Sequence, residues 1–399
     1  MSEVSIKIRR NAAQGSVSPG ECINLWSPLN PDGAKGVKFG TNMMGGDGSL
    51  EFSIRDRGQR GNWPAKKNDA AEVYYGLERA TQHSIFNVER DELEGSLQYA
   101  GQGHFAHYAK NYLLGFETAQ ALTVSQVMQA AIFGGWGSWP NDGWWTFGAP
   151  FLRYSQRYWE TSGLTNPSAT VGYARPAPNA DRILGDMLKL DDFICGIFPG
   201  REGNPDALGC YPYFRKRMKS SVDWYVKQDD IEPGGWKIEL DWSKYCNRVI
   251  AYYKDAGGVV QVVAVSDTGE QNKYSPGTRE EAVIDLTSLG NQPSSTLATA
   301  AATAWLNIYK NPQPKGSIVL PLKKVQRAGR GMQWSGLIRG GDVVKFERDE
   351  PKAFDETNPI DNYNAFLIDS TLVDVDAGTI ELRMPEASTL ETLLLDLAA

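Results

Sequence analysis

The side chains in this chain that could do metal or acid–base chemistry are few and widely spaced. The histidines are three: His83, His104 and His107. His104 and His107 could share a helical face, but a metal site needs a third ligand and none lies nearby in sequence. The cysteines are four: Cys22, Cys195, Cys210 and Cys246. They show neither zinc-site spacing nor a disulfide pattern, so we expect reduced, buried thiols, no bound metal and no cofactor.

Adjacent carboxylates are the other candidates for catalysis, because a hydrolase can pair one acid with one base of different pKa. Asp191–Asp192 and Asp229–Asp230 are two such pairs among 48 Asp and Glu residues. Neither pair stands in a recognisable catalytic pattern, and acids of this kind are usually solvated turn residues. We therefore expect a protein that is not an enzyme.

An aromatic cluster between residues 136 and 159 is a candidate for binding. Its members are Trp136, Trp139, Trp144, Trp145, Tyr154, Tyr158 and Trp159. Exposed Trp and Tyr rings beside polar groups can stack on sugars, which would suit glycan contact on a host surface. Such rings are also enriched in seams between subunits or domains, and we favour that interpretation. The sequence leaves both open.

The charge of the chain limits its classes of partner. Its 399 residues carry 41 Lys and Arg against 48 Asp and Glu, a net charge of −7. Such a surface repels nucleic-acid phosphates and anionic lipid on average, so tight DNA binding is not expected. No window approaches the roughly 18 apolar residues that a transmembrane helix needs, and the first residues lack a secretory signal pattern. We expect a protein made in the cytoplasm, without a membrane segment.

Alternating apolar residues predict that most of the chain is β-structure. Trp236, Ile238, Leu240 and Trp242 alternate with charged residues, and two β-rich runs follow, joined by hairpin chemistry at 255–258. We interpret 236–267 as one β-meander. Similar short runs lie at 4–9, 50–55, 73–77, 84–88, 93–99, 317–322, 341–346, 365–375 and 379–384. Short strands at such spacing predict a sandwich or barrel.

Helical periodicity occurs in four segments. Residues 122–132, 179–190 and 294–310 each carry an apolar stripe, and the last of them is rich in alanine. At the end of the chain, Ser388 and Glu391 have capping-box spacing. The stripe there consists of Leu390, Leu393, Leu394 and Leu397. It predicts an oligomer-forming or docking helix.

The order of these features resembles that of phage tail-hub proteins, the baseplate hub or minor tail proteins of long-tailed phages. The matching segments, in order, are 46–54, 85–99, 242–255, 279–286, 338–344 and 390–397. The resemblance implies a mainly β fold with α insertions (α+β), built of two tail-tube-like β-barrel or sandwich domains and a helical, loop-rich insertion. We interpret 35–68 and 134–178, which are longer than a minimal hub needs, as decorations.

The expected domain limits follow from this organisation. They are 1–110 for the first tube-like β domain, 111–222 for the helical and aromatic-rich insertion, 223–387 for the second tube-like β domain with its helix at 294–310, and 388–399 for the C-terminal docking helix.

The resemblance implies a structural role in the virion, assembled in the host cytoplasm. Three copies would form a ring that closes the tail tube and lets DNA pass through its lumen. The implied partners are the distal tail protein, the tape-measure protein and a central fibre or other minor tail proteins. The alternative is a virion-associated tail protein that binds or cleaves glycans with residues 136–159.

Overall fold

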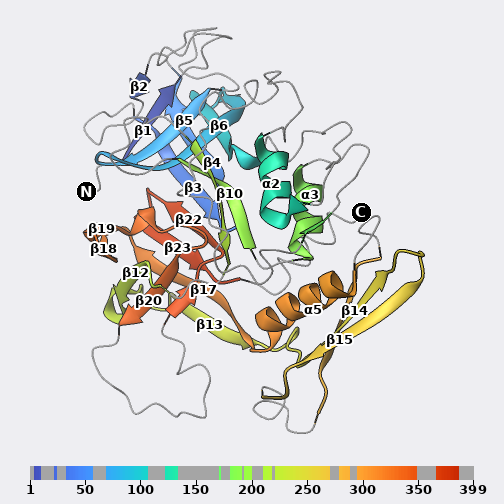
Figure 1. The fold of residues 1–399 in the computed structure, drawn as a ribbon. Coiled ribbons are helices and arrows are strands. Elements are labelled where there is room, and N and C mark those ends of the chain that lie inside the picture. Colours follow the sequence, from blue (N-terminus) through green and yellow to red (C-terminus); the bar gives the residue numbers. More distant parts are fainter. Residues whose placement is uncertain are drawn as a thin grey trace.

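The computed structural model describes residues 4–9, 22–24, 33–56, 69–106, 122–133, 170–171, 180–190, 193–199, 210–217, 221–269, 278–287, 294–347 and 365–385. Strands dominate these residues, as the mainly β prediction requires. Among the helices are α2 (Val124–Phe133), α3 (Ala180–Leu188) and α5 (Ser295–Tyr309). Figure 1 shows α2 and α3 side by side next to the first strands, and α5 in a separate module with β14 and β15.

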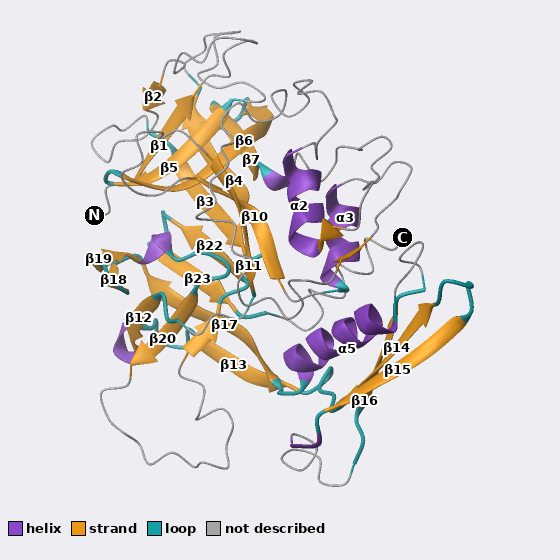
Figure 2. Cartoon of the chain, in the orientation of Figure 1, coloured by secondary structure: helices purple, strands orange, loops and turns teal. Residues whose placement is uncertain are grey.

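The largest sheet has 13 strands and contains both early and late parts of the chain (Figure 2). Its path runs β13-β17-β23-β22-β3-β4-β7-β6-β5-β1-β2, and β10 and β11 branch from β4. The bounds are β1 Val4–Arg9, β2 Cys22–Asn24, β3 Lys35–Asn42, β4 Gly45–Arg55, β5 Ala70–Tyr75, β6 Glu78–Asp91, β7 Ser96–Gly103, β10 Phe193–Pro199, β11 Cys210–Lys216, β13 Trp236–Asp241, β17 Gln313–Pro321, β22 Ser370–Asp374 and β23 Thr379–Arg383.

Three smaller sheets complete the described strands. A five-stranded sheet has the order β19-β18-β12-β20-β21, a three-stranded sheet the order β15-β14-β16, and β8 pairs with β9. Their bounds are β8 Leu122–Thr123, β9 Thr170–Val171, β12 Trp224–Lys227, β14 Arg248–Lys254, β15 Val260–Ser266, β16 Glu281–Asp285, β18 Lys324–Arg327, β19 Gly331–Trp334, β20 Val343–Glu347 and β21 Ala365–Leu367. Single 3-10 turns lie at η3 (Gln228–Asp230) and η4 (Ser335–Leu337).

One core joins the large sheet to the five-stranded sheet. Phe39 and Ile318 of the large sheet are buried in the same cluster as Trp224 and Phe366 of the smaller one. Alternate residues of each strand enter this cluster, which is why period-2 alternation in the sequence located most of these strands. A second core packs α2 and α3 against β10.

The hydrogen-bonded path of the large sheet stays open, from β13 at one end to β2 at the other. The expected closure into barrels is therefore wrong for the strands that the structure describes. The central pairing joins β3 to β22, with Lys38 opposite Asp374. The domain limits expected from the sequence stay a prediction.

Two expectations about individual segments are corrected. The supposed meander at 236–267 is split, because β13 pairs with β17 of the large sheet whereas β14 and β15 belong to the three-stranded sheet. Trp236 of β13 packs edge-on against Phe346 and Phe366, so its apolar face belongs to the main core. The supposed decoration at 35–68 contains β3, which occupies the centre of the large sheet.

The strand pair β10–β11 was not foreseen, since 111–222 was expected to be helical and loop-rich. The β10 sequence has apolar residues on both faces, a pattern that periodicity alone does not distinguish from a buried helix. Glycines allow it to pair in parallel with β4. A Cβ on Gly46 would lie 2.1 Å from the carbonyl oxygen of Ile197, and one on Gly196 2.4 Å from the carbonyl carbon of Gly45.

Candidate functional site

The apolar surface most suited to an interaction lies on the module formed by β14, β15, β16 and α5. Ten large apolar side chains are exposed in the described residues, and five of them belong to this module. These five are Tyr252, Val259, Val260, Val262 and Val283. The module is therefore the candidate site for a protein that the sequence predicts to be structural.

The hairpin β14–β15 is set by the turn chemistry at 255–258. Asp255 accepts backbone N–H groups of Gly257 and Val259 at 2.9 and 3.0 Å, and Gly258 takes the positive φ of 79° that the turn needs. A hydrogen bond from the Gln261 side chain, followed by those backbone groups, lowers the pKa of Asp255. The carboxylate thus holds the turn in its charged form, and the register follows, with Tyr252 opposite Val262.

Helix α5 covers one face of this sheet. It begins at Ser294, whose hydroxyl accepts the N–H of Leu297, and its alanine-rich side lets the helix approach the strands closely. Val249, Ala251 and Tyr253 of β14 are buried with Ala298 and Ala301 of the helix in one cluster. Cys246 lies in the same cluster, where burial raises the pKa of its thiol to about 12. The inner face of the sheet is a conventional core.

The opposite face of the sheet, which we call the outer face, has no cover in the described residues. It carries the alternate residues of each strand: Ile250 and Tyr252 of β14, Val260, Val262 and Ala264 of β15, and Val283 of β16. Val283 is 59% exposed, Val262 54%, Val260 52% and Tyr252 37%. Apolar side chains gathered in this way on one sheet face are typical of an interaction site.

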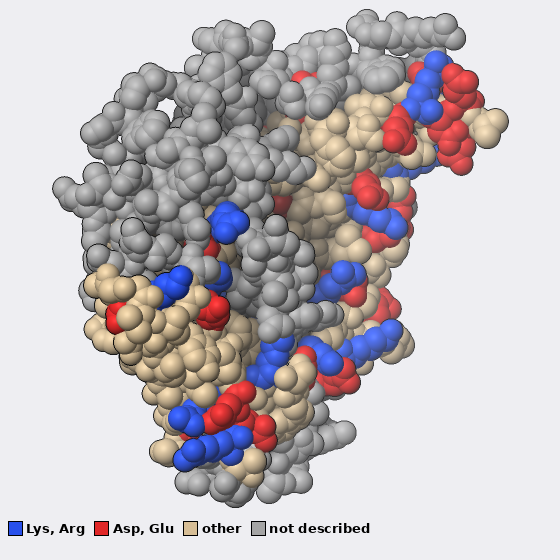
Figure 3. Space-filling model, turned by 90° about the vertical axis from the view of Figure 1, so that its right-hand side faces the viewer, with Lys and Arg blue, Asp and Glu red and all other residues tan. Residues whose placement is uncertain are grey.

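The charges on the outer face compensate one another. Arg248 binds Glu281 across the strands at 2.5 Å, at the end of the face near the start of β14. Asp285 of β16 accepts hydrogen bonds from Thr287, which lower its pKa, and the charges of Lys189 and Lys254 lower it further. The charged strand residues of the outer face, two cations (Arg248 and Lys254) and two anions (Glu281 and Asp285), therefore sum to no net charge. Figure 3 shows the side of the molecule that carries the module, where acidic and basic atoms are interspersed.

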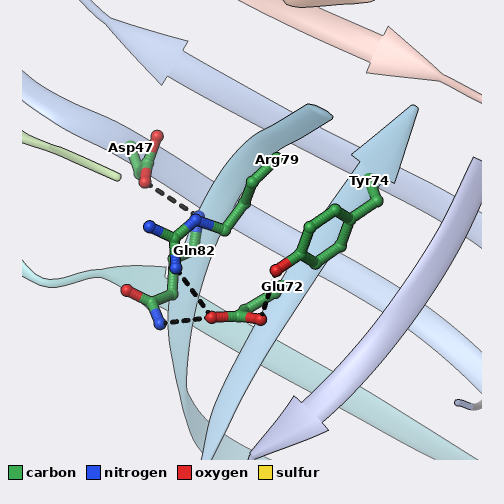
Figure 4. A network of polar contacts seen from close by, with 5 residues as sticks. All are labelled: Asp47, Glu72, Tyr74, Arg79 and Gln82. Atoms are coloured by element: carbon green, nitrogen blue, oxygen red, sulfur yellow. Dashed lines mark hydrogen bonds and ion pairs between the residues drawn. The ribbon is translucent and has the colours of Figure 1, made fainter. Parts of the chain in front are cut away.

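A second polar feature lies inside the large sheet, where Figure 4 shows five side chains that converge between β4, β5 and β6. Glu72 accepts hydrogen bonds from Arg79, Gln82 and Tyr74, all at 2.8 Å, and Asp47 accepts the backbone N–H of Gln82 at 2.9 Å. Both oxygens of the Glu72 carboxylate accept hydrogen bonds, so it could serve as a general base only by breaking this network. The arrangement fixes strand packing.

The residues considered for metal or acid–base chemistry are not gathered in the structure. His83 is fully buried in β6, and burial lowers its pKa to about 3, so it is neutral at physiological pH. His104 is buried too, and His107 lies outside the described residues. Within the described ranges, no three His, Cys, Asp or Glu side chains are placed to hold a metal ion. Cys195 and Cys246 are both buried.

The acid pairs and basic residues have structural surroundings. Asp229–Asp230 lie in η3, where Asp230 pairs with Lys323, and Asp191–Asp192 lie outside the described residues. Arg339 is buried, although it is a charged residue followed by two glycines. Its guanidinium donates to the Ala80 carbonyl at 2.5 Å and lies over the Phe198 ring. Burial lowers the pKa of Arg339.

Two groups of predicted contact residues fall outside the described part of the chain. The first is the aromatic cluster: Trp136, Trp139, Trp144, Trp145, Tyr154, Tyr158 and Trp159. The second is the leucine stripe: Leu390, Leu393, Leu394 and Leu397. Both remain predictions. The outer face was missed because β14 and β15 were interpreted only as strands, although the near-continuous apolar run Val259–Val265 was a signal of residues on both faces.

No helix in the described ranges is both long and apolar enough to span a membrane. The sequence matches no family model, and no curated protein matches it either.

Solved structures do match this fold over nearly its whole length. A tail protein from Neisseria meningitidis superposes with a TM-score of 0.58 at 12% identity, over 96% of this chain and 97% of its own. The 43 kDa tail protein of prophage MuSo2 from Shewanella oneidensis gives 0.56 at 11%, over 97% and 99%. Prophage tail protein gp18 from Listeria monocytogenes gives 0.55 at 11%, over 99% of both chains. The chain thus has the fold of these tail proteins, which confirms at the level of fold the resemblance to phage tail proteins.

Proposed function

We propose that this protein is a structural hub of a phage tail tip, in which three copies form a ring that closes the tail tube. The observation that carries the proposal is the match in fold, from end to end, with three tail proteins from different bacteria at TM-scores of 0.55 to 0.58. Its place is then the virion, which is assembled in the host cytoplasm.

The proposed action is mechanical. A hub transmits load between the tube and the distal parts, so it needs a framework that resists shear. The large sheet suits that role because β3 and β22 tie the early and late parts of the chain by a ladder of five residue pairs. Backbone ladders of this kind distribute force over several hydrogen bonds.

The proposed neighbours are the distal tail protein, the tape-measure protein and a central fibre or other minor tail proteins. DNA would pass through the lumen of the ring without being held. A net charge of −7 per copy supports that part of the proposal, because acidic walls repel phosphates. A basic lumen in an image of the ring would contradict it.

The mass and symmetry of the purified protein test the ring. Light scattering after size exclusion should give three times the 44.0 kDa of one chain, and projection images should show threefold annuli. A single-chain mass at all concentrations, together with turnover of a polysaccharide, would contradict the hub and favour the glycan-cleaving alternative. Variants of the leucine stripe 390–397 add a second measurement. If this segment is a docking helix, a charged residue in place of Leu393 should raise the protein concentration at which half of the chains are assembled.

A further inference from the structure

We infer that the outer face of the β14–β16 module is a contact through which one copy of this chain packs against a second copy. The inference rests on the proposed ring and names the surface that would hold it. The sequence of β15 is apolar on both faces. Val263 and Val265 point to α5, while Val260, Val262 and Ala264 point away from it. Strands with apolar residues on both faces are normally covered on both.

The edge of β15 that faces away from β14 supports the same conclusion, because β15 pairs with no described strand other than β14. Asp255 N–H binds the Val259 carbonyl and Asp267 N–H binds the Asn247 carbonyl at the two ends of the β14–β15 ladder. Because hydrogen-bonded and non-hydrogen-bonded pairs alternate in an antiparallel ladder, Gln261, Val263 and Val265 bond to β14. The backbone groups of Val260, Val262, Ala264 and Ser266 then point outward.

This edge differs from the other edges of the described sheets. β2, β8, β9, β19 and β21 have at most four residues, and β11, β13 and β16 carry charged side chains. β15 has seven residues, VQVVAVS, with neither a charge nor a proline. Natural proteins protect exposed edges by shortness, charge or cover. Because β15 is neither short nor charged, we expect its edge to be covered.

The lack of net charge on the outer face favours a second copy of this chain as the partner that packs on it. Two copies of a chain with a net charge of −7 repel each other in general and can approach most easily through a surface without net charge. The outer face meets that condition, because Arg248 and Lys254 balance Glu281 and Asp285. A basic or acidic partner would require a face of the opposite sign.

The position of the module also favours a second copy. Figure 1 shows α5 on the side of the sheet that faces α2 and α3, and Leu297 of α5 belongs to the core of those helices. The outer face therefore points away from the described body of its own chain. It is available to a neighbour in a ring.

Charge insertion tests the contact. Val262→Lys and Val283→Lys place an ammonium in the proposed interface on two different strands, and each should weaken assembly by roughly 30-fold or more. Met332→Lys is the matched control, since Met332 is an apolar residue of β19 with 58% exposure. All three variants should keep the thermal midpoint of the monomer, because the side chains are exposed. Assembly is measured as mass against concentration by light scattering.

Hydrogen exchange with single-residue resolution adds a readout that a general loss of stability would not reproduce. In the assembled wild type, the amides of Val260, Val262 and Ala264 should exchange slowly. In Val262→Lys, those of Val260 and Ala264 should exchange at least about tenfold faster, while the amides of Val263 and Val265 stay protected by β14.

The outcomes separate this inference from the proposed function. If the wild type forms threefold rings and both lysine variants form them equally well, this surface is not the contact and the hub proposal stands. If the wild type remains a single chain at every concentration, both fail. If Met332→Lys disrupts assembly as strongly as the other two, the effect is not specific to the outer face and the inference is overturned.

Discussion

Glu72 and Arg79 form an ion pair of 2.8 Å inside the large sheet, with side chains that are 0% and 3% exposed. The pair is completed by Gln82 and Tyr74, so every oxygen of the carboxylate has a donor. Buried charges of this kind tolerate loss of one member poorly, because the other is left without compensation. The pair therefore belongs to the framework of the sheet and not to a binding surface.

Replacement of Glu72 should be costly. We expect Glu72→Gln to lower the free energy of unfolding by about 3–5 kcal/mol, since it removes the carboxylate charge that pairs with Arg79 in the interior. Urea titration measures the change. Glu381→Gln, which removes the partner of the more exposed Arg383, should change it by less than about 1 kcal/mol. Equal losses in the two variants would contradict this view of the network.

Acid should destabilise the protein through His83. Burial lowers the pKa of this residue to about 3 in the folded state, from an ordinary value of 6.5. Between those values the unfolded chain binds a proton that the folded chain does not, so stability falls as the pH drops from 6.5 towards 3. The slope is up to about 1.4 kcal/mol per pH unit. His83→Gln should flatten the unfolding free energy across that window, and an unchanged slope would exclude His83 as its source.

A methyl group at Gly340 should not fit. Its Cβ would lie 2.2 Å from the Met43 nitrogen and 2.3 Å from the Asn42 carbonyl carbon, both backbone atoms. We expect Gly340→Ala to cost about 1–3 kcal/mol or more, because the β3–β4 turn must shift. Gly329→Ala is the comparison, as nothing lies within 4 Å and only its positive φ of 68° opposes a side chain. That variant should cost about 1 kcal/mol in the same denaturation experiment.

The aromatic cluster at 136–159 gives a prediction about sugars. If the rings fill a seam between subunits or domains, millimolar glycans should leave the tryptophan fluorescence unchanged. A saturable change would support the glycan-binding alternative instead. Trp139→Ala with Trp144→Ala should then abolish it, while Trp305→Phe in α5 should not.

Much of the fold could be predicted from local patterns. The hairpins at 255–258 and 376–378, and the helix that begins after Ser294, are predictable because turn and cap chemistry is local. Their places in the sheets could not be predicted. Nothing near Trp236 indicates that β13 pairs with β17 some 80 residues later, since that choice depends on which core receives its apolar face.

The site could be predicted only in part. The β-rich runs and the hairpin chemistry at 255–258 located β14 and β15, but they did not indicate that α5 would cover only one face of these strands. That outcome depends on where the helix is anchored, and Leu297 anchors it to the core of α2 and α3. Arg339 shows the reverse case. A charged residue in a glycine-rich turn is usually solvated, yet this one is buried because its guanidinium reaches the Ala80 carbonyl and the Phe198 ring.

The pairing of β3 with β22 has a consequence for biosynthesis. Lys38 leaves the ribosome long before Asp374, so β3 has only one of its two neighbours while the intervening chain is made. During that interval the strand presents a bare row of amides and carbonyls to the crowded cell. Completion of the protein's central sheet thus waits until residues 370–374 have been made, and a nascent chain stalled before residue 370 would be prone to aggregation.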